Sequence, residues 1–147
     1  MTIEAMLCDY ATVREGLLHV LGGGINRLWR EKFPAQMGVT LAILLEIHPT
    51  EANRQHTMNI VLLDEDGRRL AEVNADFQVG RKATSGRAGE NIIMPLAVSL
   101  QQMSIPTAGA YSVEILMDGQ HKRSLCVLAA NPTKDDRRQR GRTGSQN

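Results

Sequence analysis

Aromatic residues are scarce in this chain. Its 147 residues include two Phe, two Tyr and one Trp. Proteins that bind bases or sugar rings usually stack the rings on aromatic side chains, and five such residues are too few to build a platform of that kind readily. We therefore expect an aliphatic core and no stacking site.

Net charge is also close to zero, at +1. Five cationic and two acidic residues after Thr133 give that end a charge of +3 and leave −2 for the rest. A dedicated nucleic-acid domain normally displays a basic face, so the composition argues against one. The tail residues Arg137, Arg138 and Arg140 remain candidate nucleic-acid contacts, with a solubilising tail as the favoured alternative.

Long apolar runs are absent. No segment approaches the roughly 18 apolar residues that span a bilayer, and the first nine residues have neither a positive leader nor a long apolar region. We expect a cytoplasmic protein that does not contact membranes. Cys8 and Cys126 could bridge terminal strands, but free thiols are favoured in that compartment.

Two acidic turns closed by glycine are the most informative local feature. Asp64–Gly67 and Asp118-Gly119 each lie between β-type runs. Asp-Gly supplies the positive φ that tight hairpin turns require. The sequence therefore predicts two hairpins. Their strands are Ile60–Leu63 with Leu70–Val73, and Tyr111–Met117 with Ser124–Leu128.

The remaining pattern predicts further short strands. Gln36–His48 is the longest apolar run and is typical of a central strand, while Gly22–Gly24 predicts a bulge or bend between two strands. Seven to nine strands without a long amphipathic helix indicate one all-β domain over residues 1–130, built as a single antiparallel two-sheet β-sandwich of immunoglobulin-like or similar topology. Residues 131–147 are polar and basic and predict a disordered tail.

A combination of short motifs resembles a known family. These motifs are Asp9, Gly16, Leu18–Gly24, Glu51–Asn53, His56, Asp64–Gly67 and the Pro106…Gly109-Ala110-Tyr111…Asp118-Gly119 segment. Together they resemble a family of small uncharacterised bacterial β-sandwich proteins, a domain of unknown function. The resemblance covers nearly all of the body and implies a fold but no activity. The last segment is also similar to the final hairpin of many immunoglobulin-like sandwiches.

One strand-to-strand connection gathers Glu46, His48 and His56. Glu46 and His48 would share a strand face, and His56 would lie opposite His48 on the returning strand if residues 49–55 form the loop. Two imidazoles and a carboxylate can hold a divalent metal. The favoured alternative is a capped turn in which Asn53 adopts left-handed geometry, Thr50 or Asn53 makes side-chain hydrogen bonds, and Glu51 pairs with Arg54.

Charged loops offer two further candidate sites. Arg81, Lys82 and Arg87 lie in a glycine-rich stretch, residues 80–90, where cationic side chains and backbone amides could surround an anion; a mobile solvated loop is favoured. The two acidic turns could hold calcium if they lay at the same end of the molecule, although calcium needs six to eight oxygens.

No nucleophile signature is present, so we expect neither an enzyme nor a cofactor. The sequence predicts a non-catalytic interaction or scaffold module that presents loops 49–55 and 80–90, or an edge strand, to a protein partner or to itself as a homo-oligomer. A metal-dependent site at residues 46–56 and a nucleic-acid accessory role for the basic residues are the alternatives.

Overall fold

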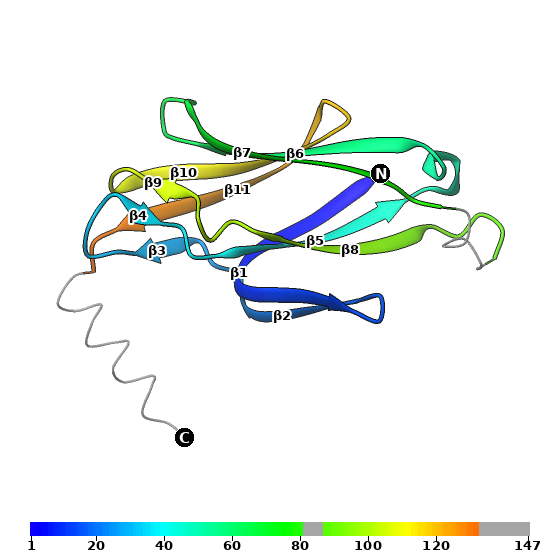
Figure 1. Cartoon of the computed structure of the whole chain (residues 1–147), viewed down its shortest axis with the longest axis horizontal. Coiled ribbons are helices and arrows are strands. Elements are labelled where there is room, and N and C mark those ends of the chain that lie inside the picture. Colours follow the sequence, from blue (N-terminus) through cyan, green and yellow to red (C-terminus); the bar gives the residue numbers. More distant parts are fainter. Residues whose placement is uncertain (81–86, 133–147) are drawn as a thin grey trace, which may run out of the picture.

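The fold is all-β, as predicted. A computed structural model describes residues 1–80 and 87–132, and within those ranges it contains strands and one short 3₁₀ turn, η1 (Pro49–Glu51), but no α-helix (Figure 1). The strands are β1 (Thr2–Arg14), β2 (Leu17–Gly23), β3 (Arg27–Trp29), β4 (Ala35–Gln36), β5 (Thr40–Ile47), β6 (Gln55–Leu63), β7 (Arg69–Gln78), β8 (Ile92–Ser99), β9 (Ser104–Ile105), β10 (Gly109–Met117) and β11 (Gln120–Ala130).

Two larger sheets and one small pair organise these strands. One sheet has the order β2-β1-β5-β8 and the other β3-β11-β10-β6-β7, while β4 pairs with β9. All ladders are antiparallel except the short parallel pair of β3 and β11. The consecutive strands β5 and β6 therefore belong to different sheets, and the chain crosses between the sheets at η1.

The inner faces of both sheets form one aliphatic core. In the first sheet β5 contributes Leu41, Ile43 and Leu45, all fully buried. From the second sheet, Ile60 of β6 and Ile115 of β10 join the same cluster. The central strand predicted over 36–48 is confirmed for residues 40–47: β5 lies between β1 and β8 and is buried along most of its length, whereas Gln36 belongs to β4.

Both predicted hairpins are present. β6 and β7 flank the first turn, where the Asp64 carboxylate accepts hydrogen bonds from the backbone N–H groups of Asp66 and Arg68. β10 and β11 flank Asp118 and Gly119, whose φ angles are 52° and 78°. Positive φ at both central residues is what a two-residue turn needs to match the strand twist, which explains Asp-Gly at this position.

β1 is shared between two ladders. Its residues Thr2–Cys8 pair with β5, and Cys8–Arg14 pair with β2. The β1–β2 hairpin packs on the outer side of the first sheet through a second small cluster, made by Cys8, Ala11 and Ala42 with Leu18 and Val20. Both cysteines are free thiols, Cys8 buried and Cys126 exposed.

The predicted glycine bend lies at the end of β2. Gly22 has a φ of 62°, and a Cβ there would collide with the Asp9 carboxylate. The backbone N–H groups of Gly24 and Ile25 then both donate to the Leu7 carbonyl. The bend takes the chain out of the first sheet towards β3 in the second, so the strands on either side of it do not pair with each other.

Candidate functional site

The three predicted metal ligands occupy different environments. Glu46 is exposed on β5 and accepts a hydrogen bond from the Asn91 side chain at 2.7 Å. His48 is also exposed and caps η1, because its Nδ1 accepts from the backbone N–H of Thr50. His56 is buried at 3% exposure on β6.

His56 is held by two acceptors. Its Nε2 lies 2.8 Å from the Glu51 carbonyl oxygen and its Nδ1 lies 2.7 Å from Asp118 Oδ2. A carbonyl and an ionised carboxylate can only accept, so both hydrogen bonds form fully when both ring nitrogens carry a proton, and this arrangement favours the imidazolium form. Burial works against that charge, but the hydrogen bonds to Asp118 and Glu51 outweigh it and raise the pKa of His56 above its usual value. The hydrogen bond from His56 lowers the pKa of Asp118.

The geometry expected for a metal site at Glu46, His48 and His56 is wrong. The expected site required β5 and β6 to be neighbouring strands, whereas β6 pairs with β7 and β10. Both ring nitrogens of His56 are already engaged, Nδ1 by Asp118 and Nε2 by the Glu51 carbonyl oxygen. Over residues 1–80 and 87–132 no group of three or more His, Cys, Asp or Glu is placed to hold a metal ion.

The capped-turn alternative is closer to the observed geometry. Asn53 has a φ of 61°, the left-handed conformation expected for it. Glu51 closes a capping box by accepting from the His48 backbone N–H at 3.0 Å. The expected pairing of Glu51 with Arg54 is wrong, because the Glu51 carboxylate binds the amino group of Met1 at 3.0 Å instead.

The His56 network predicts a pH dependence of stability. Folding raises the pKa of His56 above its value of about 6.5 in the unfolded chain. The protonated ring therefore contributes its full share of the folding stability below pH 6.5, and this contribution is lost as pH rises through the pKa of the folded protein. We expect the urea midpoint to fall between pH 6 and pH 8.5, a window below the titration of the buried Cys8 thiol, whose pKa burial raises. The His56→Gln variant should lose most of this slope. An equal slope in both proteins would contradict the assignment.

The other predicted charged sites are only partly described. Arg81, Lys82, Arg137, Arg138 and Arg140 lie outside the described residues, as does the expected tail from residue 133. Arg87 is exposed, and residues 87–90 form a turn in which the Arg87 backbone N–H donates to Glu90 Oε2.

The two acidic turns lie at opposite ends of the second sheet. β6 runs antiparallel to β10, with Leu63 opposite Ser112 and Met58 opposite Met117. Asp64 therefore follows β6 at one end, while Asp118 follows β10 at the other. The calcium alternative required both turns at the same end and is wrong for that reason.

A polar cluster on the outer face of the second sheet was missed by the sequence analysis. Glu114 on β10 accepts hydrogen bonds from His121 Nε2 at 2.6 Å and from the Ser124 hydroxyl on β11. An irregularity in the β10–β11 register lets His121 and Ser124, three residues apart, both face Glu114. No local sequence signal marks this bulge.

The cluster does not have the geometry of a hydrolytic relay. In a Ser-His-acid relay the acid and the serine bind different ring nitrogens, whereas here His121 Nε2 is within hydrogen-bond distance of both Glu114 and Ser124. Burial opposes ionisation of Glu114, but the hydrogen bonds from Ser124 and His121 lower its pKa overall. Glu114, His121 and Ser124 border a shallow depression of about 470 Å³. The hydrogen bonds from His121 and Ser124 hold the Glu114 carboxylate in place.

The edge strands of the two larger sheets are a further candidate site. Among the described residues each of β2, β8, β3 and β7 has a ladder partner on one side only. Natural proteins protect such edges by short length, proline or charge. β3 has only three residues, β8 contains Pro95, and β7 carries acidic residues on its outer side. Each of these three edges therefore has one of the protections.

β2 has none of these protections. Its seven residues, Leu17–Gly23, include no proline and no Asp, Glu, Lys or Arg. Leu17 and Leu21 are 63% and 67% exposed, and Tyr10, which pairs with Leu21 across the hairpin, is 53% exposed. We call Tyr10, Leu17 and Leu21 the hairpin patch. The apolar run 17–21 indicates a strand, but only the register with β1 shows which of its residues face outward.

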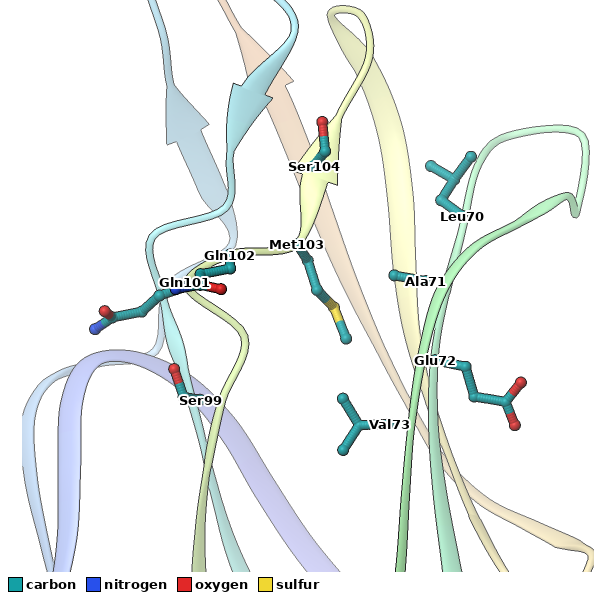
Figure 2. Close-up of a pocket in the computed structure, with 9 residues that line it drawn as sticks. All are labelled: Leu70, Ala71, Glu72, Val73, Ser99, Gln101, Gln102, Met103 and Ser104. Atoms are coloured by element: carbon teal, nitrogen blue, oxygen red, sulfur yellow. The ribbon is translucent and has the colours of Figure 1, made fainter.

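A depression of about 600 Å³ lies between β7 and the chain from Ser99 to Ser104 (Figure 2). Val73 on β7 and Met103 before β9 both point into it, while Glu72 points away. Ser99, Gln101 and Gln102 line its other side with polar groups.

These features define an all-β domain whose distinctive surfaces are strand edges and an exposed apolar hairpin. Within the described residues no helix is long and apolar enough to cross a membrane. The chain belongs to the family of unknown function DUF6941, which matches residues 4–128. The resemblance to an uncharacterised family is thereby confirmed. No curated protein matches the chain.

Proposed function

We propose that the chain is a non-catalytic interaction module that forms a homodimer through β2 and the hairpin patch. The observation that carries this proposal is the exposure of Leu17 and Leu21 on an uncharged strand edge. Large apolar side chains on an unprotected edge favour pairing with another strand.

The scaffold of this module is, in the proposal, a two-sheet sandwich related to immunoglobulin-like domains. The shared core of the two larger sheets supports it. So does Tyr111 near the start of β10, whose buried hydroxyl donates to the Thr107 carbonyl four residues upstream at 2.6 Å. A tyrosine that ties a strand start to the preceding corner recurs in immunoglobulin-like sandwiches.

A second copy fits the β2 edge because β2 is self-complementary. Antiparallel pairing of two β2 strands about a twofold axis at His19 places Leu17 opposite Leu21 of the second copy. Side chains directly opposite each other in such a ladder make stabilising contacts. Because β2 has no Asp, Glu, Lys or Arg, no register of this antiparallel pair brings two fixed like charges together. The twofold axis uses the same strand of both copies, so the assembly closes as a dimer.

Sedimentation velocity and native mass spectrometry of the untagged chain test this proposal. We expect a monomer–dimer equilibrium with a dissociation constant on the order of 10 µM, the weak range for a small interface. Dimers should be present at neutral pH and persist at 0.5 M salt, because apolar contacts are not screened. A chain that remains monomeric at 100 µM would contradict the proposal.

A further inference from the structure

The edge of β7 and the depression beside it form a second candidate interaction surface, independent of the proposed dimer; we call the space bordered by the inward-facing side chains of β7 and β8 the cleft. We propose that β7 binds an extended segment of another protein, one in which apolar residues alternate with basic residues. The segment would extend the second sheet by one strand, place its apolar side chains between β7 and β8, and direct its basic side chains over the acidic row of β7.

The inner side of the cleft is apolar and only half-covered. On β7 the residues Ala71, Val73, Ala75 and Phe77 pack against the core yet remain partly exposed. On β8 the inward-facing Met94, Leu96 and Val98 are likewise partly exposed. The depression of Figure 2 continues this opening at its Ser104 end, where Val73 and Met103 face each other across it. An added strand would cover these groups from water.

β7 is the better of the two edges to accept a strand. It has ten residues and no proline, and its ladder partner among the described residues is β6 alone. β8 contains Pro95, opposite Leu44, and lacks one backbone N–H. A strand added at β7 would have every alternate side chain directed into the cleft, the arrangement by which edge strands recognise peptides.

The outer row of β7 defines the charge of the partner. Glu72, Asn74 and Asp76 alternate there, all exposed. Asp76 accepts from the Thr57 hydroxyl, and Glu72 forms a 3.4 Å ion pair with the exposed Arg69. Cross-strand neighbours lie about 5 Å apart, so Lys or Arg on the added strand would reach both carboxylates.

The same charges disfavour a second copy as the occupant in the two registers that are centred on the acidic row. An antiparallel β7 pair about a twofold axis at Asn74 places Glu72 directly opposite Asp76, and an axis at Glu72 places two copies of Glu72 together. Like charges directly opposite are destabilising. The chain's own basic segment after Thr133 contains no apolar residue and cannot fill the cleft.

A labelled heptapeptide, Lys-Val-Arg-Val-Lys-Val-Arg, tests the proposal by fluorescence anisotropy against the full chain. We expect a dissociation constant of about 10–100 µM at low salt, typical of a short strand addition. A peptide of identical composition ordered Val-Val-Val-Lys-Lys-Arg-Arg should bind at least fivefold more weakly, and Glu-Val-Asp-Val-Glu-Val-Asp should not bind. Absence of binding by the first peptide, or equal binding of the two basic peptides, would overturn the proposal.

Reversing the charge of the row gives a matched variant. In the double variant Glu72→Lys/Asp76→Lys both changes are on exposed side chains, so the fold should be retained. The basic peptide should bind at least tenfold more weakly and the acidic peptide should gain binding. If the double variant still bound the basic peptide in preference to the acidic one, β7 would not be the site. In ¹⁵N spectra of the wild-type chain, the β7 amides should exchange more slowly with solvent when the basic peptide is bound; unaltered exchange would contradict strand addition.

This experiment is separable from the dimer test. Substitutions in the hairpin patch should leave peptide affinity unchanged, and the charge reversal on β7 should leave the monomer–dimer equilibrium unchanged. Loss of dimerisation by the β7 variant would indicate that a second copy occupies the cleft and would overturn the inference.

Discussion

Replacing Asp118 by glycine should lower the free energy of unfolding by about 2 kcal/mol, although glycine suits the left-handed turn better than aspartate does. The reason is His56. Its ring is 3% exposed and its Nδ1 donates to Asp118, so the substitution leaves a buried donor without an acceptor. Asp118 also accepts from the backbone N–H of Thr57 at 2.9 Å, which links the β10–β11 turn to β6.

The size of this effect comes from the buried donor and not from the ion pair as such. The Asp118 side chain is 49% exposed, and a charge pair screened by that much solvent contributes little. An unpaired buried donor costs about 1–3 kcal/mol. Without Asp118 the ring also loses the partner that favours its charged form, so the variant should lose the pH dependence expected from His56.

Asp118→Asn is the matched control, because asparagine keeps an acceptor oxygen and tolerates positive φ. We expect it to lose about half as much stability as the glycine variant, measured by urea unfolding at pH 6. A glycine variant within 0.5 kcal/mol of the wild type would contradict the role assigned to the network.

The features predictable from the sequence are those fixed by local chemistry. Asp-Gly at residues 118–119 and the acidic turn ending at Gly67 determine their hairpins, because few residues accept positive φ. The buried β5 follows from an uninterrupted apolar run. Asn53 adopts the expected left-handed conformation for the same local reason.

What could not be predicted depends on which strands become neighbours. Residues 46–56 have the spacing of a hairpin, yet η1 carries the chain from one sheet to the other, so His56 meets Asp118 instead of His48. The Glu114 cluster depends on a register irregularity between β10 and β11 that leaves no mark in composition or periodicity. Spacing in the sequence therefore misplaced His56 relative to His48 and gave no sign of the Glu114 cluster.

The hairpin patch provides the last prediction: the double variant Leu17→Glu/Leu21→Glu should be monomeric at concentrations where the wild-type chain is a dimer. In the proposed dimer Leu17 of each copy lies opposite Leu21 of the other, so four side chains leave water together. Burying a leucine fully contributes about 1.5–3 kcal/mol, and even partial burial of four makes the dissociation constant rise by at least 100-fold when they are replaced.

Charge repulsion adds to this loss, because four carboxylates would face each other across the twofold axis. Both leucines are more than 60% exposed, so the monomer should keep its urea midpoint. Leu128→Glu, at a 36% exposed leucine on β11 of the other sheet, is the control and should still dimerise. If sedimentation velocity shows the double variant and this control dimerising equally, the interface lies elsewhere, and β2 is an edge that tolerates exposed leucines without a partner.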